Sequence, residues 1–188
     1  NGNAEWGVSA GSPNDDGNEI TGNVGQRISR IDIDSTNSVW ITGTFCLFNQ
    51  NTYDSCDANF GAFTLSKSGT SRYTSFTAKI TENGSWDFAV TMRDDQGYGL
   101  RAGNIVLDEA NNAYISGQLC YSAPRRGSGC NYYFTNEDST ITITGNLYNP
   151  STPFNGIAFL AKINSDGVWQ WANVGGVTNS GSWGVASV

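Results

Sequence analysis

The sequence predicts an all-β protein built from antiparallel four-stranded units. Three observations favour this class. Similar strand-like segments recur at a fixed offset, Asn-Gly or Asp-Gly turns follow the same segment in each copy, and no segment has the periodicity of an amphipathic helix. The composition fits a chain with a packed core, because 12% of its 188 residues are aromatic and only 14% are charged.

The internal repeat is read directly from the sequence. Ser38–Cys46 aligns with Asn112–Cys120 at an offset of 74 residues, and Phe76–Gly84 aligns with Phe159–Gly167 at an offset of 83. The second copy therefore carries nine extra residues, which lie between positions 130 and 159. A repeat of this length exceeds most helical solenoid units and suits a multistranded β unit with long loops.

Each copy is expected to form four strands. A turn joins the first strand to the second, and another joins the third to the fourth. Strand one precedes a tight Asp- and Asn-bearing turn, strand two ends at a cysteine, and strands three and four flank the Asn-Gly or Asp-Gly turn, which is a strong hairpin signal. The expected spans are 27–34, 38–45, 75–81 and 85–92 in the first copy, and 102–108, 112–119, 156–164 and 168–174 in the second.

The repeat continues past both copies. Asn1-Gly2 and Trp6 align with Asn83-Gly84 and Phe88, which predicts a terminal fourth strand, and residues 181–188 resemble the start of a third copy. The expected organisation is a single β-repeat domain: 1–26 a terminal strand and loop, 27–101 the first unit, 102–180 the second unit, and 181–188 the start of a third.

Four cysteines form two local pairs. Cys46 and Cys56 are 10 positions apart, and so are Cys120 and Cys130. This equal spacing favours two local disulfides over the other connectivities, and a four-cysteine zinc site is the competing interpretation. Loops this short would each stabilise the fold by roughly 2.5–3 kcal/mol in the chain-entropy model. Disulfides place the chain in an oxidising compartment, so the expected location is extracellular or the cell surface, after secretion.

Several motifs together resemble the repeat of secreted bacterial β-propellers, the SBBP or seven-bladed propeller family. They are the segment Ala58–Gly69, the string Phe76-Thr-Ala-Lys-Ile, the Asn-Gly turn followed by an aromatic residue, and the pattern Asp-x-x-x-Asn-x-aromatic-Ile-x-Gly. The resemblance covers nearly the whole chain. It implies propeller-like blades of four antiparallel strands in an extracellular setting, and it implies no catalytic residues.

The sequence departs from that family in its repeat number. It holds about two and a quarter repeats, whereas a closed propeller needs roughly four to eight blades. Uncovered blade faces and strand edges favour association. The chain is therefore expected to self-assemble into a ring or an open stack, with Trp6, Trp183 and Val188 at or near the contacts. A fragment of a longer propeller protein and a self-sufficient monomer are the alternatives.

Two ligand sites are also predicted. Oxygen-bearing side chains that could bind calcium occur at Asn14, Asp16, Asn18 and Glu19. An acidic turn without a metal is the simpler interpretation there. Tyr121, Tyr132 and Tyr133, in or beside the second cysteine loop, could bind glycans by ring stacking, and this lectin-like role is the alternative function.

The composition excludes several function classes. The chain has no histidine, which removes Ser-His-Asp and Cys-His catalysis and histidine-ligated zinc. A net charge of −7 argues against nucleic acid as a partner, and the short apolar runs argue against a membrane span. The expected function is that of a structural, self-assembling protein rather than an enzyme, with no cofactor apart from the possible calcium.

Overall fold

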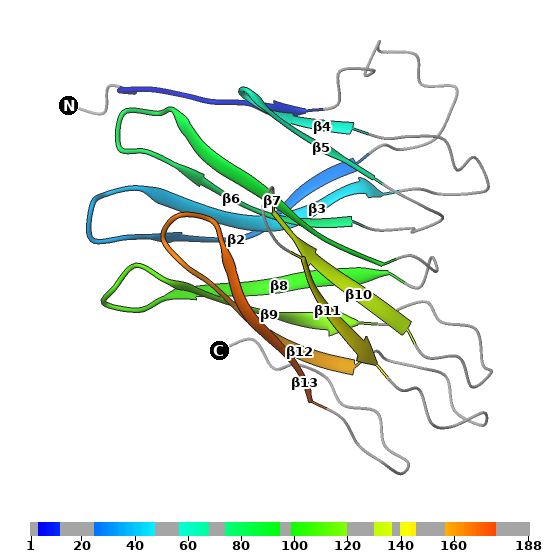
Figure 1. The fold of residues 1–188 in the computed structure, drawn as a ribbon. Helices are drawn as coiled ribbons and strands as arrows, with labels where there is room; N and C mark the ends of the chain where they lie inside the picture. The colour runs from blue at the N-terminus through cyan, green and yellow to red at the C-terminus, as the bar shows by residue number, and fades with distance from the viewer. Residues whose placement is uncertain are drawn as a thin grey trace, which may run out of the picture.

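A computed structural model describes residues 4–11, 25–47, 57–67, 74–94, 99–119, 130–136, 140–145 and 157–175 of the chain. These residues form antiparallel β-sheets joined by turns, and no helix occurs among them (Figure 1). The all-β prediction is therefore confirmed for this part of the chain.

Each copy of the repeat forms a four-stranded antiparallel meander. The first unit runs in the order β2 (Gly25–Ile33), β3 (Val39–Leu47), β6 (Thr74–Ile80) and β7 (Trp86–Asp94). The second unit runs in the order β8 (Leu100–Leu107), β9 (Ala113–Leu119), β12 (Ile157–Ile163) and β13 (Trp169–Gly175). The eight expected spans agree with these strands to within two residues at each end.

Two hairpins between the second and third strands of the units were not expected. The first is β4 (Asp57–Phe60) with β5 (Phe63–Ser66), and the second is β10 (Cys130–Thr135) with β11 (Thr140–Gly145). We call them the bridging hairpins, because each pairs outside its own unit. Strand β10 pairs with β7 of the first unit, and β4 pairs with β1 (Ala10–Gly11).

The two bridging hairpins pair in the same register. Phe134 of β10 lies opposite Met92 of β7, and Phe60 of β4 lies opposite Ala10 of β1. Phe60 and Phe134 are equivalent in the repeat, and the alignment of Trp6 with Phe88 makes Ala10 the equivalent of Met92. Strand β1 therefore has the position of the last strand of a unit that would precede the first one.

The turns inside the units share one geometry. The amide of Gly84 donates to the carbonyl of Thr81, and the Thr81 amide donates to the carbonyl of Ser85, the residue directly after the loop. Gly84 has φ of 79°, and Asn37 occupies the same left-handed position of its own turn with φ of 61°. These are three-residue loops that close with a left-handed residue, which explains why Asn or Gly is required there.

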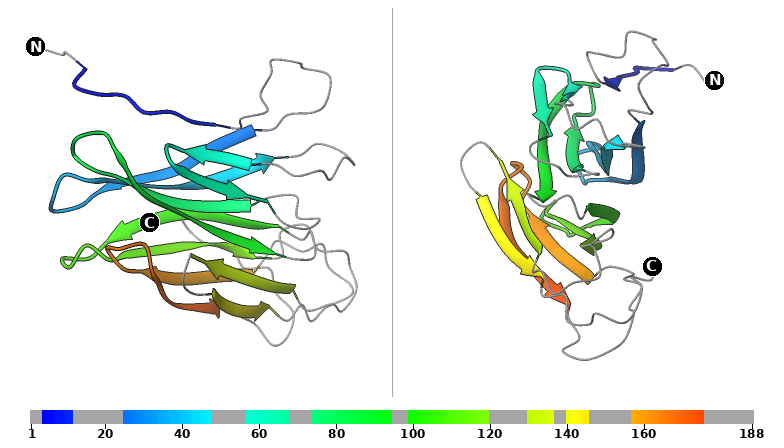
Figure 2. Two further views of the ribbon diagram at one scale, coloured as in Figure 1. Left: turned by 45° about the horizontal axis from the view of Figure 1, so that its top comes forward. Right: turned by 90° about the vertical axis from the view of Figure 1, so that its right-hand side faces the viewer.

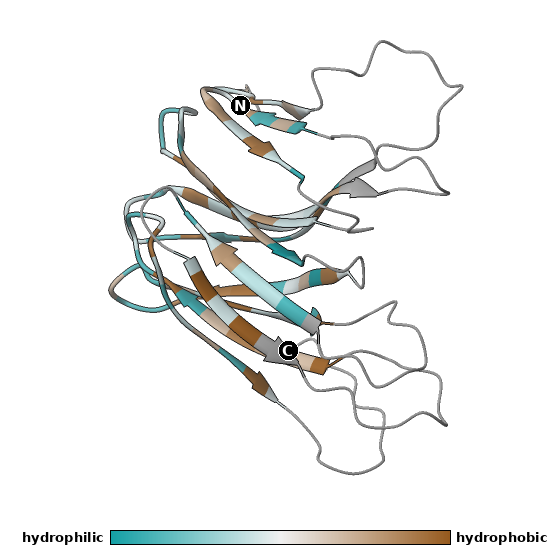
Figure 3. Ribbon diagram, turned by 45° about the vertical axis from the view of Figure 1, so that its right-hand side comes forward, coloured by the Kyte–Doolittle hydropathy of each residue, from teal (hydrophilic) through white to brown (hydrophobic). Residues whose placement is uncertain are grey.

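The buried hydrophobic side chains of the described residues form two clusters. The larger one lies between the units and joins strands of both to β10. The smaller one lies on the opposite side of the first unit, under the hairpin β4–β5. Ring pairs repeat between them: Phe60 packs edge-on against Trp86 at 5.1 Å between centroids, and Phe134 packs against Trp169 at the same separation. The clusters are thus two versions of one packing arrangement, and Figure 3 shows the hydrophobic residues distributed along the strands of both units.

Close backbone approach fixes one glycine in each unit. A Cβ atom at Gly43 would lie 2.0 Å from the carbonyl oxygen of Arg27, and one at Gly117 would lie 2.0 Å from that of Arg101. In each unit this carbonyl comes from the strand that bulges at the equivalent place. Because the obstructing atom is backbone, no side-chain rotation can relieve the overlap.

Replacing either glycine by alanine should therefore strongly destabilise the fold. We expect Gly43→Ala or Gly117→Ala to lower the free energy of unfolding by about 3 kcal/mol, measured by urea denaturation. Gly103→Ala is the control, since its Cβ would find its nearest atom at 3.7 Å, and it should change stability by less than about 1 kcal/mol. Equal effects at Gly43 and Gly103 would contradict this explanation.

Candidate self-association interface

The contact between the two units inside the chain is the best-defined interface of the molecule. Strand β8 of the second unit packs across β2, β3 and β6 of the first, and the two units lie one on the other (Figure 2). Ile105 on β8 is only 3% exposed at this contact. We call it the internal joint.

Polar groups fix the alignment of the joint. The carboxylate of Asp32 accepts a hydrogen bond from the Leu107 amide at 3.0 Å. The Ser75 hydroxyl donates to the carbonyl of Leu100 and accepts from the amide of Ala102. At the turn end of the joint, the amide nitrogen of the Ser35 backbone donates to the side chain of Asn111 at 3.1 Å. The bonds of Asp32 and Ser75 give partners to backbone groups on the outer edge of β8, which pairs with β9 alone among the described strands.

A charged group lies against an aromatic ring in each unit. In the first unit, the carboxylate of Asp34 accepts from the indole of Trp40 at 3.0 Å, and the ammonium of Lys79 lies 3.8 Å from the same carboxylate. Lys79 also donates to the carbonyl of Ser165 in the second unit at 3.4 Å. The joint covers Trp40 and the Asp34 side chain completely.

The second unit carries the equivalent group without a cover. Tyr114 replaces Trp40, its hydroxyl bonds to Asp108 at 3.3 Å, and Lys162 donates to both residues. The side chain of Asp108 is 30% exposed, whereas that of Asp34 is fully buried. The difference arises because the second unit covers the first, and nothing among the described residues covers the second.

The two carboxylates have lowered pKa values. Burial by itself would raise the pKa of Asp34, but bonds donated by Thr36, Trp40 and the turn amides outweigh it and hold the pKa below its usual 3.8. The side chain and amide of Asn112 lower the pKa of Asp108 to about 2. Both aspartates organise their turns by accepting hydrogen bonds from nearby backbone amides.

A large ring packs on a turn glycine at the edge of the joint. A Cβ atom at Gly167 would lie 2.7 Å from the ring of Phe88, which belongs to the last strand of the preceding unit. Gly84 has the same relation to Trp6, at 2.8 Å, and the Trp6 indole donates to the Glu82 carbonyl at 2.9 Å. Trp6 therefore fills in the first unit the place that Phe88 fills in the second.

One face of the first unit exposes aliphatic side chains. Ile28, Ile31 and Ile33 of β2 are 59%, 62% and 60% exposed. We call this the leading face. Its repeat equivalents on β8 are Ala102 and Ile105, which are 2% and 3% exposed, and Leu107, which packs partly buried in the joint.

The opposite face of the second unit carries the counterparts of residues that lie in the internal joint. We call it the trailing face, and it consists of Val106, Tyr114, Leu160 and Trp171. Leu160 is 43% exposed, whereas its equivalent Thr77 is fully buried in the joint. Trp171 contacts Tyr114 as Phe88 contacts Trp40. The two exposed faces thus correspond to the two halves of the internal joint.

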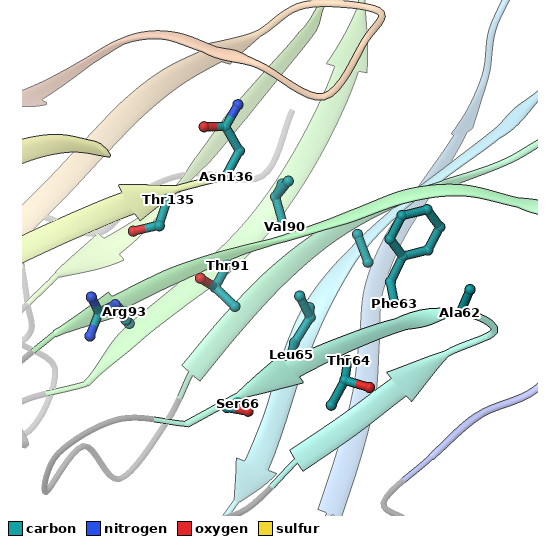
Figure 4. A pocket seen from close by; sticks show the side chains of 11 residues that line it. Ala62, Phe63, Thr64, Leu65, Ser66, Val90, Thr91, Arg93, Thr135 and Asn136 are labelled. Atoms are coloured by element: carbon teal, nitrogen blue, oxygen red, sulfur yellow. The ribbon is translucent and has the colours of Figure 1, made fainter. Parts of the chain in front are cut away.

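A groove of about 440 Å³ lies between the first bridging hairpin and β7 (Figure 4). Phe63 and Leu65 line it from β5, Arg93 lines it from β7, and Asn136 closes it beyond the end of β10. The Arg93 guanidinium also lies 5.3 Å from the ring centre of Tyr133. The groove combines one ring with hydrogen-bonding side chains.

The structure describes the side chains of three of the predicted site residues, and one of them, Tyr132, differs from its expected setting. Tyr132 was expected to bind a ligand at the surface, but its side chain is fully buried, with its hydroxyl 3.5 Å from the carbonyl of Gly99. Strand alternation explains this, since Tyr132 and Phe134 face the core while Tyr133 faces away. Trp6 is 40% exposed and packs on Gly84 of its own chain.

The other predicted site residues lie outside the described residues. These are the calcium candidates Asn14, Asp16, Asn18 and Glu19, the contact residues Trp183 and Val188, and Tyr121. Cys46 and Cys130 lie in β3 and β10, but their side chains, like Cys56 and Cys120, are not described. Within the described ranges, no cluster of three acidic or cysteine residues could hold a metal ion.

The searches for similar proteins add no family to this description. No protein-family model matches the sequence, and no curated protein or solved structure is significantly similar to it. Helices of the length and apolarity needed to cross a membrane do not occur in the described part of the chain.

The lowered pKa values predict acid sensitivity with a definite sign. A carboxyl group whose folded-state pKa lies below 3.8 stabilises the fold above that pH, and the stabilisation is lost as the pH falls from about 4 toward 2. The double variant Asp34→Asn, Asp108→Asn should be less stable at pH 7 and should lose less stability over that interval.

Urea denaturation at a series of pH values measures this dependence. Glu109→Gln is the matched control, because Glu109 is exposed on the turn that Asp108 organises, and it should leave the stability at pH 7 unchanged. A double variant whose stability falls with acid as steeply as that of the wild type would contradict the assignment.

Proposed function

We propose that the protein is an extracellular structural component that assembles with copies of itself, and that its units are propeller-like blades. In the assembly, the leading face of one copy packs on the trailing face of the next. The paired cysteines support the extracellular location. The strand order within each unit, an antiparallel meander of four, is the order expected of a blade.

One observation carries the proposal. Positions that are buried in the second unit by the first, at Ala102 and Ile105, are occupied in the first unit by Ile28 and Ile31, which are about 60% exposed. Burial of apolar surface stabilises by about 25 cal/mol per Å², and the two isoleucines lack this stabilisation as long as the face is open. Exposed aliphatic rows of this kind mark interaction surfaces.

The internal joint supplies the geometry of the proposed contact. A copy that docks by the same rotation and translation places its leading isoleucines against Val106, Tyr114 and Leu160 of its neighbour. Such a contact is head-to-tail, because two different faces meet. It closes into a ring if the rotation between units returns to its start, and otherwise it continues as a filament.

Charges on the leading face should abolish assembly. Ile31→Asp with Ile33→Asp puts two carboxylates into the proposed contact, where burial without partners is costly, and should weaken association about 100-fold or more. Because both side chains are mostly exposed in the single chain, the variant should keep its fold. Light scattering and negative-stain electron microscopy across a concentration series measure the effect.

Thr140→Asp with Thr142→Asp is the matched control. It adds the same charge at exposed positions of β11, which carries no residue of either face, and should assemble as the wild type does. A monodisperse wild-type monomer at high concentration would contradict self-assembly and would favour a longer chain whose own units cover the faces. Equal assembly of the two double variants would contradict the leading face as the contact.

The groove beside the first bridging hairpin favours a second candidate, glycan binding. It offers Phe63 for ring stacking, and Arg93 and Asn136 for hydrogen bonds. Asn136→Ala should reduce the signal of any hit on a glycan array at least tenfold, whereas exposed Asn173→Ala should not. An array without hits would remove this candidate.

A further inference from the structure

We propose that β1 occupies, within a single chain, the place that β13 of a neighbouring copy takes during assembly. Head-to-tail joining then exchanges one strand for another: β1 leaves the first bridging hairpin, and the β13 region of the preceding copy pairs there instead. This inference rests on the proposed self-assembly and specifies how the contact forms.

The first support is the pairing register. Each bridging hairpin pairs with the last strand of the unit before it, as β10 does with β7. For β4 that place is taken by β1, with Ala10 opposite Phe60. In the repeat, Met92, Ala10 and Gly175 are equivalent. When a neighbour's second unit precedes the first unit, its Gly175 therefore arrives at the position that Ala10 holds.

The second support is steric. The ring of Trp6 packs on Gly84, and the equivalent ring of the last strand of the second unit is Trp171. A neighbour docked with the geometry of the internal joint brings Trp171 onto Gly84, as Phe88 is brought onto Gly167. Two indole rings cannot share that place, so docking with this geometry requires Trp6 to leave.

The third support is how weakly β1 is held. Among the described residues, β1 pairs with β4 at two positions, whereas β7 pairs with β10 at four. Residues 4–10 are all exposed, and even Trp6 and Val8 are 40% and 37% exposed, while Phe88 is 8% exposed. An exposed segment of this kind, anchored by the ring of Trp6, opens at low cost in free energy.

The edge of β4 and the arriving strand β13 are both able to pair with a further strand. Among the described strands, β13 pairs with β12 alone, so its other edge is available for a partner. Open strand edges associate by adding a further strand. The arriving strand also brings the rest of its sheet, so its contact includes Tyr114 and Leu160 as well as Trp171.

Opposite effects of two equivalent tryptophans test the exchange. Trp6→Ala removes the anchor of β1 and should strengthen association about tenfold, while Trp171→Ala removes the arriving ring and should weaken it about tenfold. Sedimentation or light scattering across a concentration series gives both values. Glu5→Ala is the control in the same exposed segment and should change neither the fold nor the association.

The outcomes separate the exchange from self-assembly itself. Assembly of Trp6→Ala at lower concentrations than the wild type needs supports the exchange. Wild-type assembly that Trp6→Ala leaves unchanged or weakens overturns the exchange and retains self-assembly. Wild type and Trp6→Ala that both stay monomeric at high concentration overturn both.

Hydrogen exchange gives a second, independent measurement. In assembled wild type, the amides of β13 should gain protection relative to the single chain, and those of Ala10 and Gly11 should lose it. Protection that rises at β13 and also persists at Ala10 and Gly11 would overturn the exchange, because both strands would then be paired at once.

Discussion

The packing of a large ring from one unit onto a left-handed glycine of the next holds the repeat in register. Phe88 on Gly167 and Trp6 on Gly84 show the same contact twice, and only glycine leaves room for the ring while adopting the φ near 80° that the turn requires. Around this contact, Asp34, Trp40 and Lys79 are fixed by one another and by the following unit. The packing of each unit therefore depends partly on its neighbour, because residues of both units form the core between them.

The same face of the repeat is buried in the first unit and exposed in the second, and a difference in side chains explains how one sequence pattern allows both. The first unit places small polar residues such as Thr42, Ser75 and Thr77 on the buried side. The hydroxyls of Thr42 and Ser75 donate to backbone carbonyls, and the Thr77 hydroxyl donates to that of Thr42. The second unit has Ser116, Ala158 and Leu160 at the equivalent positions, and Leu160 is exposed. The repeat thus keeps its backbone geometry and changes its surface chemistry from one copy to the next.

The strands and turns of the units could be predicted because they depend on local signals. Asp34 with Asn37 and Asp108 with Asn111 specify their turns within a few residues, and the Gly84 and Gly167 turns do the same. The bridging hairpins were not predicted although Ala58, Phe60, Phe63 and Leu65 alternate as strand residues should. Each hairpin is short, and its outer pairing, of β4 with β1 and of β10 with β7, depends on a distant part of the chain. Burial of Tyr132 depends on that same distant pairing, so proximity to the cysteine loop gave the wrong prediction of a surface site.

The two open faces differ chemically, and this difference gives any stack of such units a direction. One end offers a row of isoleucines on β2, and the other combines Val106 and Leu160 with Tyr114, Trp171 and the partly exposed pair of Lys162 with Asp108. A molecule shaped to fit the isoleucine row does not fit this mixed surface of aliphatic, aromatic and charged groups. Length can therefore be set by a terminator at one end while the other end continues to accept subunits, in the manner of a polar polymer.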